Sequence, residues 1–200
     1  EAMGCGGMEI FFPLAEAFHT QAEPMFCGLG TLVNVLNALE VDPGVISVGS
    51  WRWYSESMLH CCVDLEEIKK RGLTFDEWGC IARCQGLGVA MVRAHESTLD
   101  AFREAVVKSC ASTNLVLCVA YTRKPLGQTG DGHFSPIGGY HAASDSLLLL
   151  DVARFKYPPH WLPLQRLWEC MLPVDSQTDL SRGYALLSRS ISYLGPCALT

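Results

Sequence analysis

The chain has no long apolar run and little positive charge. Its longest uninterrupted apolar stretch, Leu115–Tyr121, is far shorter than the roughly 20 residues that a membrane-spanning helix needs. Fifteen basic against 21 acidic residues give a net charge of −6, and the largest basic cluster is Lys69–Arg71. Because nucleic-acid binding requires a basic stripe, we expect neither a nucleic-acid partner nor a membrane partner. The first residues also lack the basic and then apolar pattern of a secretory signal.

The cysteine content is too low for a disulfide scaffold. Ten cysteines in 200 residues fall below the proportion typical of small disulfide-rich proteins. Cys61 and Cys62 are adjacent, and Cys80 and Cys84 are four apart in a helical pattern, which suits bridges poorly. We therefore predict mostly free thiols in a reducing compartment, and hence a cytoplasmic protein. A secreted, disulfide-bonded protein is the alternative.

The composition that remains is that of a folded domain. Apolar residues make up 49% and charged residues 18%, which excludes a disordered chain. We find no internal repeat, linker or low-complexity tract. The length suits one domain, or two small lobes that share a cleft.

Helical patterns dominate the first half of the chain and strand patterns the second. Apolar spacing and capping residues predict helices at 27–39, 64–71, 74–86, from 97 onward, and at 163–171. Alternating or continuous apolar runs predict strands at 89–92, 115–121, 133–140, 146–153 and 184–188. This order indicates an α+β fold with a helical N-terminal lobe and an antiparallel sheet in the C-terminal lobe. A cleft between the lobes is the expected site.

Cys27 is the candidate nucleophile. Pro24 cannot lie inside a helix, so the chain enters extended and the helix begins near Cys27. A thiol at a helix N-terminus feels the positive end of the helix dipole, which favours the thiolate. Gln21 lies six residues upstream, and its amide could hold an oxyanion. A buried structural cysteine and a surface glutamine are the alternatives.

His133 and Asp151 are the candidate base and its orienting partner. His133 and His141 bracket one predicted strand, and residues 142–145 form a turn into the next strand. In an antiparallel hairpin of that register, Asp151 is a diagonal neighbour of His133. Asp151 follows four leucines, and a buried carboxylate needs a partner. A thiolate nucleophile needs such an oriented histidine, although a lone histidine is more often structural.

Five blocks of the sequence resemble phytochelatin synthases. They are Thr20–Pro24 with Phe26–Leu29, Val35–Leu39, Trp51–Tyr54 with Glu56–Leu59, Gly130–His141, and Asp151–Trp161. The resemblance extends over roughly residues 10–190 and implies a papain-like fold. It also implies that residues 1–200 form a single catalytic domain, without the cysteine-rich C-terminal domain of the plant members. Carried over residue by residue, it makes Cys27 the nucleophile, His133 the base, Asp151 its orienting partner and Gln21 the oxyanion donor.

The activity implied by the resemblance is acyl transfer from glutathione. Family members release glycine, hold γ-glutamylcysteine as a thioester on the cysteine, and pass it to a second glutathione or a growing phytochelatin. Because glutathione is anionic, we predict that Arg154 and Lys156, two apart on an extended segment, contact it. Further substrate contacts are predicted at Glu23, Phe26, Gly28, Gly132 and Tyr157. For Gly28 we expect that the missing side chain lets the substrate backbone approach.

The resemblance implies no organic cofactor. It implies a heavy-metal ion, cadmium or zinc, either as an activator or as the thiolate complex of glutathione. Candidate metal ligands are Cys61, Cys62, Cys80 and Cys84, but their spacing does not match a zinc motif, so core thiols are the preferred interpretation. A homodimer is a further hypothesis. Two functions remain as alternatives: hydrolysis of glutathione, its conjugates or peptides on the same fold, and metal buffering by a thiol-rich protein without catalysis.

Overall fold

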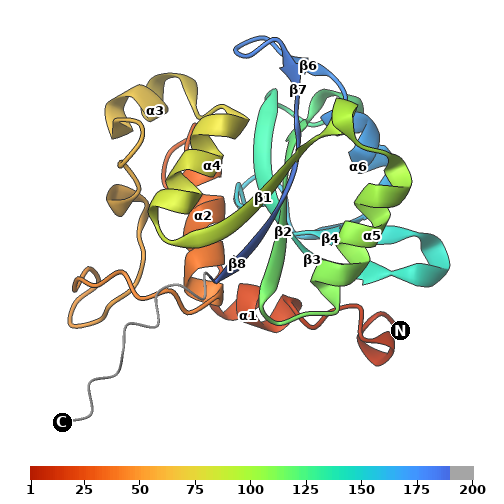
Figure 1. Ribbon diagram of the computed structural model, residues 1–200, viewed down its shortest axis with the longest axis horizontal. Coiled ribbons are helices and arrows are strands. Elements are labelled where there is room, and N and C mark those ends of the chain that lie inside the picture. The colour runs from red at the N-terminus through yellow and green to blue at the C-terminus, as the bar shows by residue number, and fades with distance from the viewer. Residues whose placement is uncertain (190–200) are drawn as a thin grey trace.

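A central antiparallel sheet carries helices on both of its faces (Figure 1). The computed structural model describes residues 1–189. The helices are α1 Phe11–Glu16, α2 Cys27–Ala38, α3 Leu65–Arg71, α4 Phe75–Cys84, α5 Leu99–Cys110 and α6 Leu164–Met171. The strands are β1 Leu87–Arg93, β2 Leu115–Thr122, β3 Gly132–His141, β4 Ser146–Leu149, β5 His160–Pro163, β6 Val174–Asp175, β7 Leu180–Ser181 and β8 Gly183–Arg189.

The local signals in the sequence set the ends of the early helices. Asp64 caps α3 by accepting from the backbone N–H of Glu66, and Gly72 ends the helix with a positive φ. Thr74 and Glu77 form the predicted capping box of α4. No helix within residues 1–189 is both long and apolar enough to cross a membrane.

The main sheet has six strands in the order β1-β8-β2-β3-β4-β5, and each neighbouring pair is antiparallel. Side chains of β2 alternate between two apolar clusters, one against the helical lobe and one against α5 and α6. Val116, Cys118 and Ala120 belong to the first cluster. Because both faces of β2 are covered, this strand reads as a continuous apolar run rather than an alternating one. The predicted α+β class with a helical first lobe is confirmed, and α5 and α6 cover the opposite face of the sheet.

The hairpin formed by β3 and β4 has the predicted register. Ile137 faces Leu149 and His141 faces Ser146, with a bulge between Ile137 and Gly139. The strand predicted at 146–153 is shorter, because β4 ends at Leu149. Beyond it, the Asp151 carboxylate accepts a 2.8 Å hydrogen bond from the backbone N–H of Ala153. This side-chain-to-backbone bond turns the chain and places Asp151 in the loop after the strand.

Candidate active site

Cys27 is the first residue of α2, at the edge of a cleft of about 410 Å³. The residue as a whole is half-buried. Burial works against the thiolate, but the His133 imidazolium and the backbone N–H groups of Phe134 and Gly28 outweigh it and lower the pKa of Cys27. The helix start predicted from Pro24 and the apolar spacing is confirmed, and the thiol therefore lies at the positive end of the helix dipole.

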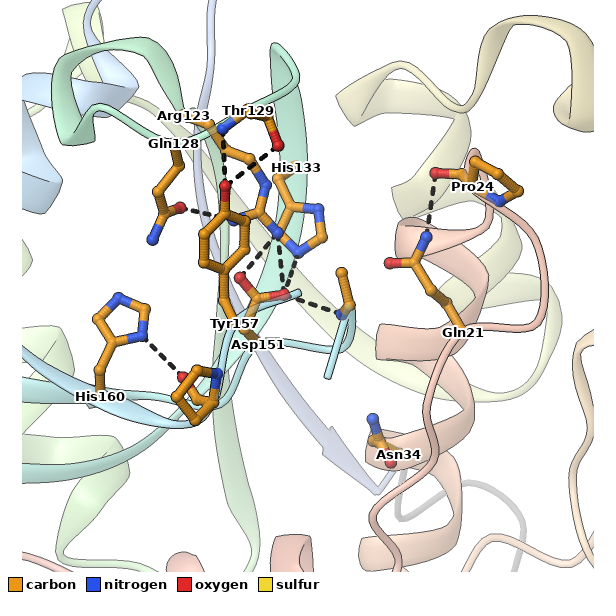
Figure 2. A network of polar contacts seen from close by, with 12 residues as sticks. Gln21, Pro24, Asn34, Arg123, Gln128, Thr129, His133, Asp151, Tyr157 and His160 are labelled. Atoms are coloured by element: carbon orange, nitrogen blue, oxygen red, sulfur yellow. Dashed lines mark hydrogen bonds and ion pairs between the residues drawn. The ribbon is translucent and has the colours of Figure 1, made fainter. Parts of the chain in front are cut away.

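His133 and Asp151 form a buried pair (Figure 2), and His133 also interacts with the Cys27 thiol. The distance from His133 Nε2 to Asp151 Oδ1 is 2.9 Å. The carboxylate of Asp151 has no solvent exposure. Burial acts to lower the pKa of His133, yet the Cys27 thiolate and the Asp151 carboxylate outweigh it, so the pKa is raised. The three side chains thus favour the thiolate–imidazolium form that nucleophilic attack requires.

Arg123 is a neighbour of this pair that the sequence analysis missed. It follows β2, and its Nη2 lies 2.9 Å from Asp151 Oδ1 and 2.7 Å from Oδ2. Burial tends to raise the pKa of Asp151, but His133 and then Arg123 lower it, so the carboxylate stays ionised. No local pattern points to this contact, because Arg123 and Asp151 are far apart in the sequence.

Gln21 lies across the cleft from His133 and is buried (Figure 2). Its Nε2 donates to the carbonyls of Glu23, at 2.8 Å, and Pro24, at 3.0 Å. Its Oε1 is buried without a hydrogen-bond partner among the described residues. The Glu56 carboxylate accepts from the backbone N–H of Ala22 at 3.1 Å and so fixes this segment. Gln21 therefore lines the same cleft as Cys27, with its amide turned toward the loop that precedes α2.

Only some of the predicted substrate contacts line the cleft. Gly132 and Lys156 do, together with Gln21, Cys27 and His133. Lys156 is exposed and has no ion-pair partner in the described part of the chain. Gly132 lies against a buried arginine, because a Cβ there would stand 3.5 Å from Arg182 Nη2.

The other predicted contacts lie outside the residues that line the cleft, and their surroundings explain why. The Glu23 carboxylate pairs with Lys69 at 2.8 Å. Phe26 packs against the apolar cluster of the helical lobe. A Cβ on Gly28 would approach Leu73 and Trp78 to 3.0 and 3.1 Å, so packing by itself accounts for a glycine here, and the substrate contact stays a prediction. Arg154 is exposed.

Tyr157 contacts protein groups with both its ring and its hydroxyl. The ring lies under the Arg123 guanidinium, 4.7 Å from Cζ to centroid. The hydroxyl accepts from the backbone N–H of Thr129 at 2.7 Å. These contacts tie two loops together, and they leave Tyr157 outside the cleft lining.

Arg182 and Asp175 are cleft residues that the sequence analysis also missed. Arg182 is buried, and its Nη1 donates to the Pro173 carbonyl at 3.3 Å. Its Nη2 lies 3.6 Å from Asp131 and 3.9 Å from Asp175, which are ion-pair distances rather than hydrogen bonds. A buried guanidinium and a carboxylate side by side complement a ligand group that carries both an anionic carboxylate and a cationic amine.

The four cysteines considered as metal ligands are surface residues joined by disulfides. Cys61 pairs with Cys84, and Cys62 pairs with Cys80. The predictions of free thiols and of core thiols are wrong for these four positions, since none of them is buried. The spacing of four residues on α4 places each helical cysteine opposite one of the adjacent pair. Metal ions bind thiolates, so these sulfurs are not available as ligands while the disulfides are formed. The ligand atoms of Cys61, Cys62 and Cys84 lie within 4.8 Å of one another, and a metal site at this cluster stays a prediction. The predicted cytoplasmic location rested on free thiols and stays a prediction.

Two solved peptidase domains share the fold of this chain. The peptidase domain of Streptococcus ComA, a bi-functional ABC transporter involved in quorum sensing, superimposes with a TM-score of 0.53 at 15% identity, covering 86% of this chain and 97% of that one. A double glycine motif protease from an AMS/PCAT transporter, solved in complex with the leader peptide, superimposes with a TM-score of 0.51 at 14% identity, covering 86% of this chain and 89% of that one. The fold is papain-like.

The sequence defines the family more narrowly. The family model described as phytochelatin synthase matches residues 1–184, and the chain belongs to this family. It is 52% identical to glutathione gamma-glutamylcysteinyltransferase 3 of Lotus japonicus, over 98% of this chain and 42% of that protein. It is 52% identical to glutathione gamma-glutamylcysteinyltransferase 1 of Arabidopsis thaliana, over 94% of this chain and 39% of that protein. It is 47% identical to the Schizosaccharomyces pombe enzyme, over 91% of this chain and 44% of that protein. The chain therefore spans less than half the length of these relatives.

Proposed function

We propose that this chain is the catalytic part of a glutathione γ-glutamylcysteinyltransferase that makes phytochelatins for heavy-metal detoxification. One observation carries the proposal: Cys27, a half-buried residue at the start of α2, is next to the buried His133–Asp151 pair, in a cleft of a phytochelatin synthase family member. Cys27, His133 and Asp151 form the catalytic triad of this proposal. The names of the relatives supply glutathione as the substrate.

In the first step, the Cys27 thiolate attacks the carbonyl carbon of the bond between cysteine and glycine in glutathione. The tetrahedral intermediate collapses when the His133 imidazolium gives its proton to the departing amine of glycine. A thioester between Cys27 and γ-glutamylcysteine remains, and His133 is left neutral. Asp151 stabilises the imidazolium before that transfer and holds the ring in place.

The oxyanion of this intermediate needs donors next to Cys27. The Gln21 amide is the proposed side-chain donor, and it reaches the oxyanion after giving up its bond to the carbonyl of Glu23 or Pro24. The carboxylate and amine of the γ-glutamyl group fit Arg182 and Asp175, which line the same cleft. These contacts would place the acyl group before chemistry starts.

In the second step, the amine of another glutathione attacks the carbonyl carbon of the thioester, and neutral His133 accepts the proton of that amine. The bond between this carbon and the Cys27 sulfur then breaks, which releases the lengthened peptide and restores the Cys27 thiolate beside the His133 imidazolium. Transfer exceeds hydrolysis only where the acceptor amine is held close, because water is present at high concentration. Lys156 is an exposed cation on the cleft and has no ion-pair partner in the described chain. It is the proposed contact of the acceptor carboxylates.

Lys156→Ala is expected to lower the ratio of transfer product to hydrolysis product several-fold at low glutathione, while glycine release continues. Raising the glutathione concentration should restore part of the ratio. Product ratios are measured by mass spectrometry. The control is Lys108→Ala, which removes the same charge from an exposed position on α5. Arg154→Ala tests an exposed arginine that does not line the cleft. An unchanged ratio for Lys156→Ala would place the acceptor elsewhere.

Cadmium or zinc enters this proposal as the thiolate complex of glutathione, and thus as substrate. The test of the function is incubation of the protein with glutathione, with and without cadmium, followed by mass spectrometry. We expect oligomers of γ-glutamylcysteine and equimolar glycine, with more product when cadmium is present. Free γ-glutamylcysteine alone would instead identify a hydrolase, and unchanged glutathione with bound cadmium would identify a metal buffer. The homodimer stays a prediction.

A further inference from the structure

Arg123 is itself a cleft-lining residue, and it contacts both the candidate triad and the neighbouring loops. It directly follows β2 and is 3% exposed. Its Nη2 and the Nε2 of His133 approach the same oxygen, Asp151 Oδ1, each at 2.9 Å. Asp151 Oδ2 has Arg123 as its ion-pair partner, at 2.7 Å, and no hydrogen-bond partner in the described chain. The guanidinium therefore contacts both oxygens of the carboxylate (Figure 2).

The far side of the guanidinium is held by two loops. Its Nη1 donates to the Gln128 side chain, and its Cζ lies 4.7 Å from the centre of the Tyr157 ring. The Tyr157 hydroxyl in turn accepts from the backbone N–H of Thr129 at 2.7 Å. Thr129 and Lys156 both line the cleft. The chain of contacts thus runs from the cleft wall through Tyr157 and Arg123 to Asp151.

We propose that Arg123 is a positioning residue, which fixes the orientation of Asp151 and offsets part of its negative charge so that the His133 imidazolium can release its proton to the leaving amine. The inference rests on the proposed function, because it concerns the triad of that reaction. A carboxylate with two buried oxygens and only one cationic neighbour would hold the imidazolium proton more strongly. A general acid works best when its pKa is close to the working pH.

The groups that face Asp151 set the sign of the effect. His133 comes from β3, Arg123 follows β2, Tyr121 contributes a buried neutral hydroxyl from β2, and Cys27 approaches His133 from α2. Since Arg123 and His133 share one oxygen, a positive charge on Arg123 disfavours a positive charge on His133. Loss of that charge, with Asp151 still ionised, should raise the pKa of His133.

Three variants separate charge from geometry. Arg123→Met removes the charge, Arg123→Lys keeps the charge but loses the planar fork, and Tyr157→Phe keeps the ring and removes only the hydroxyl that holds Thr129. The measurement is the pH titration of the His133 imidazole by NMR in the free protein, with the signal assigned by comparison with His133→Ala. Glutathione turnover and thermal unfolding are measured on the same variants.

For Arg123→Met we expect the pKa of His133 to rise by about one unit and kcat to fall by about 10²-fold. For Arg123→Lys we expect the wild-type pKa and a kcat between those of Arg123→Met and wild type. Tyr157→Phe should leave the pKa unchanged and lower kcat less than Arg123→Met does. These outcomes together support a positioning role.

An unchanged pKa of His133 in a folded Arg123→Met protein would overturn the charge-balancing role. If Arg123→Lys raises only KM, with kcat and the pKa unchanged, Arg123 contacts substrate instead and the inference is wrong. Arg123→Met and Arg123→Lys could both lower the unfolding temperature to the same extent and leave the pKa of His133 in the folded protein unchanged. That result would show that Arg123 only stabilises the fold through its ion pair. The titration needs no glutathione, so it decides the inference even if the protein shows no transferase activity.

Discussion

Cys27→Ser is expected to abolish both thioester formation and turnover of glutathione. The serine hydroxyl is nearly isosteric, but it lacks the thiolate character that His133 and the backbone N–H groups of Phe134 and Gly28 confer on Cys27. The loss of a nucleophile from a triad is on the order of 10⁶-fold in kcat. The measurements are glycine release over time and the mass of the intact protein after brief exposure to glutathione, in which the acyl adduct of wild type should be missing from the variant.

A matched control shows that the effect comes from position rather than from loss of a thiol. Cys118 is a free thiol that is fully buried in β2, and burial raises its pKa well above the ordinary value. Cys118→Ser should therefore keep the acyl adduct, although a buried hydroxyl costs stability, about 1–3 kcal/mol if it is left without a partner. Persistent turnover in Cys27→Ser would contradict the papain-like mechanism itself.

His133→Ala is expected to lower kcat/KM by about 10²–10⁴-fold, the contribution of a positioned acid–base group. The equivalent substitution His141→Ala should leave most activity, because His141 lies at the other end of β3 from His133. There it bonds to Ser144 Oγ at 2.8 Å and packs against Trp161 of β5. The two histidines come from the same strand, so they form a matched pair. The opposite outcome would mean that the wrong histidine of β3 has been assigned as the base.

The pH profile of wild type tests the same pair. The pKa of Cys27 is lowered and that of His133 is raised, so the thiolate–imidazolium form is present at pH values between these two pKa values. As the pH falls through the lowered pKa of the thiol, the nucleophile is lost. As it rises through the raised pKa of the imidazolium, the proton for the leaving glycine is lost. We expect a bell-shaped dependence of kcat/KM whose two limbs belong to the pair rather than to single residues, and His133→Ala should remove this bell.

Much of the site could be predicted from sequence because its signals are local. Pro24 and the apolar spacing after Cys27 determine where α2 begins, and the helix then has to present Cys27 at its N-terminus. The turn at residues 142–145 and the apolar runs on either side determine the hairpin register. That register brings His133 and Asp151 near each other, although the sequence pattern placed Asp151 at the end of a strand that stops earlier.

The prediction for the α4 cysteines was wrong because the same sequence pattern is consistent with two orientations of the helix. Cysteines four apart on a helix indicate a shared face, but not whether that face is toward the core or toward solvent. Helix α4 directs Trp78 into the core, where its Nε1 donates to the Gly28 carbonyl at 3.0 Å, and this rotation leaves Cys80 and Cys84 outside. They then meet the loop that carries Cys61 and Cys62. The packing of the Trp78 ring against Gly28 is likewise a tertiary contact that the sequence pattern does not indicate.

The sequence by itself determined the class of fold, the start of the helix that carries Cys27 and the pairing of His133 with Asp151, because each depends on residues close in the chain or on one hairpin. Only the tertiary structure decided what surrounds them. Arg123 reaches Asp151 from the end of another strand, and Arg182 reaches the cleft from the segment just before β8. Charged side chains are buried only where distant segments supply their partners, and no periodic pattern along the chain predicts which distant segments come into contact.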